Sequence, residues 1–280
     1  MRAKVQSIDV LRIKRKGSIE EPDLVVVEEP LEIRVGHGEK DAREQISLSV
    51  TMRTPGDDEL LCLGFLFAEG IINSYEEVSS VKPCHDSGKA EEIGNVIRVE
   101  LKPEVNFDST KFVRNFFTNS SCGVCGKTSI DSVKSYAEAP IDKGISFSAD
   151  TLKVLHQNLQ STQEVFKHTG GLHACGFFDK NGNIIAHKED VGRHNALDKL
   201  IGEQLLKGEL PIYSYGLILS GRISFELVQK AVRAGILVVA GVGAPSSLAV
   251  DLAKEFKVTL VGFLKEDGYN IYTGKQRILI

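Results

Sequence analysis

YGLIL at residues 215–219, ILVVA at 236–240 and VTLVGFL at 258–264 are three short apolar runs. Apolar periodicity predicts helices between them, over Ile223–Ala234 and Ser246–Phe256. Apolar strands that alternate with helices are typical of a parallel sheet that is covered on both faces and joined by right-handed crossovers. We therefore predict an α/β domain whose sheet is mostly parallel, with Ile236–Ala240 at its centre.

The loops that follow these strands are small and polar. Ser220-Gly221-Arg222 follows the first strand, Gly241–Ser247 the second and Lys265–Gly268 the third. Ligands of such sheets bind beyond the carboxyl ends of the strands, so we expect these loops to meet at one edge. Free N–H groups at helix starts favour a phosphate or another anion there. Turn geometry alone would also explain Gly241-x-Gly243, which lacks the third glycine of the dinucleotide fingerprint.

The preceding residues extend the same domain. Ser148 is a predicted cap of a helix from Ala149 to about Lys167, and Leu172–Phe178 is a predicted strand that turns at Asn181-Gly182. A polar loop over residues 189–195 is expected before a helix at Ala196–Leu206. Its charged side chains are either ordinary exposed loop residues or ligands for a polar molecule. His187-Lys188-Glu189 also matches the His-x-Glu of zinc deaminases, but the cysteine pair precedes it instead of following it.

The first half has a different pattern. Apolar and polar residues alternate over Leu31–Val35 and Ile46–Met52, which predicts two paired strands with one buried face. Thr54 followed by Pro55 indicates the start of an apolar, buried helix that extends to Glu69. Ala139–Gly144 is the best linker candidate. We predict an N-terminal α+β domain over residues 1–140 and a C-terminal three-layer α/β domain over residues 145–280.

Composition excludes several classes of protein. A net charge of −4 over 280 residues leaves no electrostatic footprint for nucleic acid. No apolar run is long enough to span a bilayer, and the first residues contain no apolar signal segment, so we expect a cytoplasmic protein without a membrane partner. The five cysteines are an odd number without framework spacing, which fits free thiols in a reducing compartment.

Cys122-Gly123-Val124-Cys125-Gly126-Lys127 is the clearest chemical motif. A zinc site would need a second pair of ligands, and the remaining cysteines are single and far apart. A thioredoxin-type dithiol would follow an apolar strand, which this pair does not. A sulfur-carrying thiol needs an exposed loop and a thiolate, for which the glycines and Lys127 are suited. A structural buried pair is the remaining alternative.

These features resemble the formate dehydrogenase accessory sulfurtransferase family, the FdhD/NarQ family, over nearly the whole chain. The motifs that carry the resemblance are Glu29-Pro30-Leu31, Thr54-Pro55-Gly56, Ser121–Gly126, Thr169–His173, Glu189–Lys199, Ser220–Arg222, Gly241–Ser247 and Asn270–Gly274. The resemblance implies a sulfurtransferase that accepts persulfide sulfur from a cysteine desulfurase. It would pass the sulfur to the molybdenum (or tungsten) bis-pterin guanine dinucleotide, Mo-bis-MGD, before this cofactor is inserted into formate dehydrogenase.

The resemblance also assigns roles to residues. Cys122 would carry the persulfide and Cys125 would be the assisting thiol, and no metal ligands are implied. The cofactor would contact the stretch that comprises Phe263, Leu264, Lys265, Glu266, Asp267 and Gly268. Further candidates at the same sheet edge are Arg222, Gly243, Ser246, His194 and Arg193. The family implies a homodimer and a second domain that looks like the cytidine-deaminase fold without its zinc chemistry.

Two other classes of function stay open on the sequence. A chaperone that binds the cofactor without transferring sulfur would have the same C-terminal half. A metal-binding or redox module would use Cys122 and Cys125 instead, and stoichiometric zinc in the purified protein would favour it.

Overall fold

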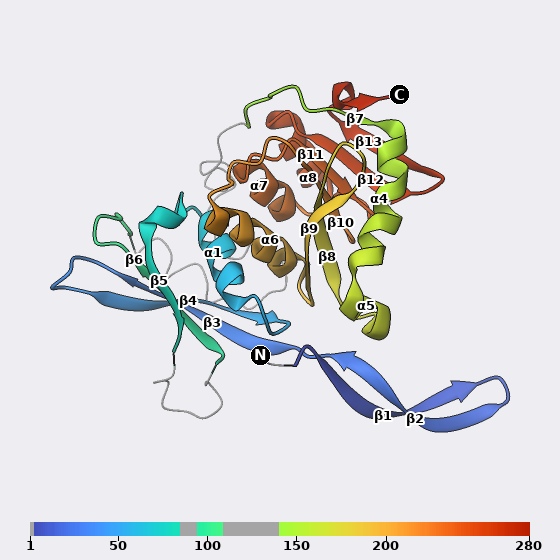
Figure 1. Cartoon of the computed structure of the whole chain (residues 1–280), viewed down its shortest axis with the longest axis horizontal. Coiled ribbons are helices and arrows are strands. Elements are labelled where there is room, and N and C mark those ends of the chain that lie inside the picture. The colour runs from blue at the N-terminus through green and yellow to red at the C-terminus, as the bar shows by residue number, and fades with distance from the viewer. Residues whose placement is uncertain (1–2, 85–93, 109–139) are drawn as a thin grey trace.

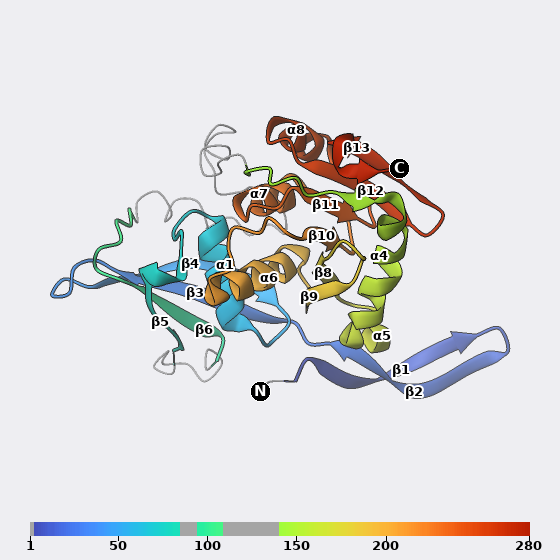
Figure 2. The same ribbon diagram turned by 45° about the horizontal axis from the view of Figure 1, so that its top comes forward.

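A six-stranded sheet forms the centre of the C-terminal half. The structure, a computed structural model, describes residues 3–84, 94–108 and 140–280, and Figures 1 and 2 show these from two directions. The strand order is β13-β12-β11-β10-β8-β9. The strands are β8 (His173–Phe178), β9 (Ile184–Asp190), β10 (Gly216–Leu219), β11 (Val238–Gly241), β12 (Thr259–Lys265) and β13 (Gly268–Thr273).

The three apolar runs are parallel neighbours, as predicted. β11 lies between β10 and β12 and pairs in parallel with both. The prediction of a mostly parallel sheet is wrong for the sheet as a whole, because β8, β9 and β13 are added in antiparallel pairings. The hairpins β8–β9 and β12–β13 explain this, since strands joined by a short turn have to run in opposite directions. The sheet is therefore mixed.

Helices cover both faces of this sheet. The helix α4 (Ala149–Thr162) packs on one face, and α6 (Arg193–Lys207), α7 (Phe225–Arg233) and α8 (Ser247–Glu255) lie on the other (Figure 1). Neighbouring residues of one strand serve the two faces: Leu260 packs with the second group of helices and Val261 with the α4 side. Burial on both faces explains why these strands are apolar throughout.

The N-terminal half contains a second sheet and one buried helix. The sheet has the order β4-β3-β6-β5, and its inward residues Leu31, Ile33 and Val35 are buried as predicted. Its strands are β3 (Glu29–His37), β4 (Glu44–Arg53), β5 (Val78–Pro83) and β6 (Val96–Leu101). A hairpin of β1 (Val5–Lys14) and β2 (Gly17–Val26) projects from the body, and β7 (Phe147–Ser148) pairs with β14 (Ile278–Leu279) (Figure 1).

The helix α1 (Asp58–Ala68) joins the two halves by packing against α6. Two glycines permit an unusually close approach. A Cβ on Gly64 would collide with the backbone carbonyl of Asp198, and one on Gly202 would collide with the carbonyl of Leu60. Residues of both halves then share one apolar core. The proposed boundary near residue 140 stays a prediction.

Three local predictions require correction. Helix α1 begins after Asp57, which has a left-handed backbone (φ 57°), so Thr54 is not its cap. The expected helix to Lys167 is broken at Gln163 into α4 and α5 (Glu164–Thr169). The expected polar loop over residues 189–195 is largely regular structure, because β9 extends to Asp190 and α6 begins at Arg193. Ser148 does cap α4, since its Oγ accepts a hydrogen bond from Thr151 N.

Candidate functional site

Backbone hydrogen bonds join two of the three predicted loops at the carboxyl edge of β10 and β11, and Phe263 of β12 contacts them. Gly243 N donates to Gly221 O at 3.1 Å, and Phe263 N donates to Gly243 O at 3.2 Å. A Cβ on Gly243 would lie 2.8 Å from the backbone N of Arg222, so only glycine fits between the loops. The prediction that the loops meet is confirmed for Ser220–Arg222 and Gly241–Ser247. It is wrong for Lys265–Gly268, which forms the turn between β12 and β13, and only Phe263 within β12 reaches the other two loops.

The antiparallel strand β8 brings His173 to the same edge. Ser220 N donates to Ala174 O at 2.9 Å, and Ala174 N donates to Ser220 Oγ at 2.9 Å. A Cβ on Gly221 would lie 3.3 Å from His173 Nδ1, so the imidazole ring lies directly beside this loop. His173 was not predicted as a site residue, because its position at the edge depends on the direction of β8.

The first turn of α6 adds two basic side chains. His173 pairs with Asp190, the last residue of β9, and α6 begins three residues later with Arg193 and His194. His194 Nε2 lies 3.1 Å from Ser224 Oγ and 3.7 Å from Glu226 Oε2, at the start of α7. Burial raises the pKa of Glu226, but hydrogen bonds from His194 and Ser224 outweigh it and hold the pKa at about 2. Glu226 is therefore a carboxylate that is already engaged.

Carboxylates do not fully neutralise the positively charged side chains at this edge. The side chains of Arg193 and Arg222 form no hydrogen bond or ion pair with the part of the chain that the structure describes, and Arg193 Nε is buried. Burial and the charges of Arg193, His194 and Arg222 lower the pKa of His173, against a small opposing effect of Asp190. We call His173, Arg193, His194 and Arg222 the basic edge.

The predicted cofactor stretch begins beside the basic edge and extends away from it. Phe263 is 46% exposed and has a left-handed backbone (φ 55°), a conformation that costs energy in residues other than glycine. Leu264 packs into the core on the α4 side, so its side chain is not available to a ligand. Lys265 pairs with Gly268 across the hairpin turn, and Glu266 accepts a hydrogen bond from Gln157 of α4 at 2.9 Å.

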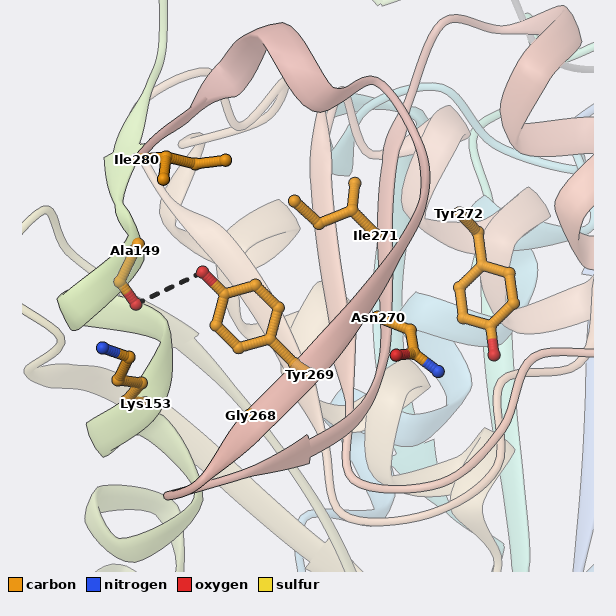
Figure 3. Close-up of a pocket in the computed structure, with 8 residues that line it drawn as sticks. All are labelled: Ala149, Lys153, Gly268, Tyr269, Asn270, Ile271, Tyr272 and Ile280. Carbon is orange, nitrogen blue, oxygen red and sulfur yellow. Dashed lines mark hydrogen bonds between the residues drawn. The ribbon is translucent and has the colours of Figure 1, made fainter.

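An open hollow of about 700 Å³ lies beyond this turn, between β13 and the start of α4. Figure 3 shows Tyr269 pointing toward α4, where its hydroxyl donates to Ala149 O at 3.4 Å, and Lys153 beside it. Tyr272 points the other way in the same view. Gly268 is the predicted site residue that lines the hollow. The stretch 263–268 therefore extends from the basic edge to this hollow.

Comparison with known proteins agrees with these motifs. The FdhD/NarQ family model matches residues 26–279. The chain belongs to the FdhD/NarQ family. The sulfur carrier protein FdhD of Mycolicibacterium paratuberculosis is 48% identical over 263 residues, which cover 93% of this chain and 94% of that protein. The sulfur carrier protein FdhD of Sulfurisphaera tokodaii is 40% identical, with 98% and 99% covered.

A solved structure has the same fold. The crystal structure of a proposed formate dehydrogenase accessory protein from Desulfotalea psychrophila superposes with a TM-score of 0.74 at 24% identity, covering 99% of this chain and 100% of that one. At this identity the likeness concerns the fold of the FdhD/NarQ chain and not the details of its site. No helix among the described residues is long and apolar enough to cross a membrane.

Other site predictions for this FdhD/NarQ chain have specific outcomes. Cys122 and Cys125 lie outside the described residues. Ser246 is the cap of α8, since its Oγ accepts from Ala249 N at 3.2 Å. The deaminase alternative weakens, because Glu189 accepts hydrogen bonds from Val165 N and Phe166 N at the start of α5. A carboxylate in that role is not placed to act as a general base.

The family motif Glu189–Lys199 also holds the two halves together. Lys199 Nζ lies 2.7 Å from Asp190 Oδ2 and donates to Thr54 O at 2.9 Å, with both charged groups buried. Thr54 N donates to Asp190 Oδ2, and Thr54 Oγ1 accepts from Val191 N. Asn195 Nδ2 donates to Met52 O at 2.7 Å. Thr54, predicted as a helix cap, is therefore bound to the C-terminal half through all its polar groups.

Proposed function

We propose that this chain is a sulfur carrier that serves formate dehydrogenase. The observation that carries the proposal is the family membership over residues 26–279, with full-length relatives called sulfur carrier protein FdhD, together with a Cys-x-x-Cys motif. Cys122 is the proposed carrier and Cys125 the assisting thiol. The buried cysteines Cys62 and Cys175 are unsuited, because burial raises the pKa of both thiols well above the usual value.

The proposed chemistry is thiol exchange. The Cys122 thiolate attacks the outer sulfur of a persulfide on a cysteine desulfurase, the donor S–S bond breaks, and the donor thiolate leaves. The product is Cys122–S–SH. Attack of the Cys125 thiolate on Cys122 Sγ then releases hydrosulfide and forms a Cys122–Cys125 disulfide, which a cellular dithiol reduces before the next cycle. The released sulfur is a soft ligand that suits the metal of the substrate cofactor.

The proposed recipient is Mo-bis-MGD, which binds transiently as a substrate and is then inserted into formate dehydrogenase. Three features support binding at the basic edge and the stretch 263–268. Phe263 exposes an aromatic ring, Arg193 and Arg222 have charges without a partner in the described chain, and the hollow beside Gly268 is open. The proposal also includes a homodimer, a cytoplasmic location and a likeness to the cytidine-deaminase fold. These three parts rest on the family resemblance.

Mass spectrometry after incubation with a cysteine desulfurase and cysteine tests the carrier role. We expect an adduct of about 32 Da, one sulfur atom, on Cys122. Cys122→Ala should abolish it, and Cys84→Ser, a half-exposed cysteine outside the motif, is the matched control. An adduct that persists in Cys122→Ala and disappears in Cys125→Ala would reverse the assignment. An unloaded protein that still binds the cofactor would instead support a chaperone, and stoichiometric zinc a metal module.

A further inference from the structure

We propose that the β1–β2 hairpin is an exchange arm, which docks on strand β4 of a second copy of this chain while the arm of that copy docks on the first. The arm comprises Val5–Val26, and Val27 and Glu28 join it to β3. The inference rests on the proposed function only in that a homodimer is part of it. It goes further by naming the two surfaces that hold the copies together.

The arm has no core of its own. All residues from Leu11 to Glu20 are exposed, and Ile13 is 72% exposed, more than any other large apolar side chain of the described chain except the terminal Ile280. Further exposed apolar residues of the arm are Ile8, Leu11, Ile19 and Leu24. A two-stranded hairpin is at best marginally stable alone in water, yet β1 and β2 pair over ten positions without a register shift. A surface that covers the arm would stabilise it.

Strand β4 is suited to receive another strand. It forms one edge of its sheet, which has the order β4-β3-β6-β5. Charges or prolines usually protect such edges, but residues 45–52 contain neither. Val50 is 57% exposed and Met52 47% exposed on this strand. An added strand would cover these side chains and use the backbone groups of the edge.

The arm and the receiving sheet match in length and direction. β3 and β4 extend from the joint at Val27 and Glu28 to one side of the molecule, and the arm extends to the other side in both views (Figures 1 and 2). Each strand of the arm has ten residues, while β3 has nine and β4 has ten. A two-fold axis near the joint would therefore lay each arm along the β3–β4 hairpin of the other copy.

The direction of the strands selects β1 as the strand that contacts β4. β1 runs away from the joint and β4 runs toward it, so the two would be antiparallel across the two-fold axis. β1 contains no proline, whereas β2 has Pro22 at its middle, which lacks a backbone donor. Ile8 lies three residues into β1, and Val50 lies three residues before the end of β4. These two exposed side chains would meet beside the axis.

The far ends of the two hairpins carry opposite charges. The tip of the arm has three cations that form no ion pair with the described chain: Lys14, Arg15 and Lys16. The end of the β3–β4 hairpin has three carboxylates that are equally unpaired among the described residues: Glu39, Asp41 and Glu44. Lys40 offsets part of this negative charge, and Arg43 is bound to Glu100 and to backbone carbonyls. The exchange would bring each tip beside these carboxylates.

The area of the contact is sufficient for a stable dimer. An arm of ten residue pairs is about 33 Å long and about 10 Å wide, so each of its faces measures about 330 Å². Each arm covers an equal area of the other copy, and the two reciprocal contacts would remove about 1,300 Å² from water, which is within the range of specific interfaces. Both surfaces belong to the same chain, so a second copy satisfies both at once.

Sedimentation equilibrium of the full chain measures the dissociation constant of the dimer. Leu11→Asp on the arm and Val50→Asp on β4 each place a charge in both reciprocal contacts and should weaken the dimer about a hundredfold or more. Ile185→Asp is the matched control, because Ile185 is a 50% exposed residue of β9 in the other sheet. It should leave the dissociation constant unchanged.

Charge reversal tests whether the occupant is a second copy. One variant reverses the tip with Lys14→Glu, Arg15→Glu and Lys16→Glu, and another reverses the hairpin end with Glu39→Lys, Asp41→Lys and Glu44→Lys. Each variant alone brings like charges together at both contacts and should dimerise about tenfold or more weakly than the wild type. In an equal mixture, opposite charges meet again at both contacts, so heterodimers should form with nearly the wild-type affinity.

Three results would overturn the exchange arm. One is a wild-type chain that stays monomeric at its highest soluble concentration, even if Leu11→Asp then weakens binding to a cysteine desulfurase. Another is a dimer that neither aspartate variant weakens while their unfolding temperatures match the wild type. The third is a mixture of the charge-reversed variants without heterodimers. Sulfur loading of Cys122 is measured separately, and a dimer that accepts no sulfur would contradict the sulfur carrier and leave the exchange arm intact.

Discussion

Charged residues on the two sides of the first turns of α6 have opposite environments. On the side toward the N-terminal half, Asp190 and Lys199 are buried, paired and completed by hydrogen bonds to Thr54. On the side toward the sheet edge, Arg193 lacks a partner in the described chain and His194 shares one carboxylate with Ser224. Residues of one motif that lie within ten positions of each other therefore serve different purposes.

The difference separates residues that hold the fold from residues that are available to a ligand. Charged side chains whose hydrogen bonds are all made within the chain are not available to a ligand. Removing one partner of such a buried pair destabilises the protein. Charges that remain uncompensated cost stability until a ligand arrives, which is typical of functional sites. Substitutions on the two sides should therefore change stability by different amounts.

The largest effect is expected where α1 and α6 meet. Gly202→Val would force a side chain into the carbonyl of Leu60 and separate the helices, with a cost of about 5 kcal/mol or more in the free energy of unfolding. Gly268→Ala is the control, because open space surrounds the Cβ position there. Urea unfolding measures both. A Gly202→Val protein as stable as the wild type would show that the close contact is not required.

The buried ion pair should have the next largest effect. Lys199→Met leaves the Asp190 carboxylate buried without its cation and should lower the free energy of unfolding by about 3–5 kcal/mol. Lys207→Met, on the same helix, removes an exposed pair with Glu203 and should cost less than about 1 kcal/mol. Similar losses in the two variants, measured by urea unfolding, would contradict the distinction between the two sides.

Glu226 should make the stability of the protein depend on pH in the acidic range. Because its pKa is about 2 in the fold against a usual 4.5, its contribution is complete above pH 4.5 and is lost as the pH falls toward 2. The expected size is about 1–3 kcal/mol. Thermal unfolding across this range measures it, with Glu226→Gln as the comparison. The variant should lose less stability on acidification, and an equal loss would mean that other carboxylates carry the effect.

The smallest predicted effect is a gain in stability, whereas the preceding substitutions lower it. Arg193→Gln removes a cation from the positive end of α6 and should raise the free energy of unfolding by about 0.3–1 kcal/mol. The gain should shrink at high salt, because screening removes the repulsion. Urea unfolding at two salt concentrations measures it. A loss of stability instead would show that Arg193 is part of the scaffold.

The apolar runs of the sequence were sufficient to predict the three parallel strands. Similar local patterns predicted the helices between these strands and the cap at Ser148. They also predicted the burial of Leu31, Ile33 and Val35. These features depend on local patterns, and a local pattern states which face of an element is apolar. The Cys-x-x-Cys motif and the family resemblance were also present in the sequence, and so was the basis for expecting the loops after β10 and β11 to meet.

The roles of His173 and Thr54 depended on tertiary structure. His173 reaches the edge because β8 runs antiparallel to β10, and Thr54 binds Asp190 and Lys199 from the other half of the chain. Strand direction and partners far apart in sequence follow from the packing of whole elements, which no local pattern specifies. The motif Glu189–Lys199 shows this most clearly: its composition marks it as charged, and only packing decides which charges are paired and which remain at the edge.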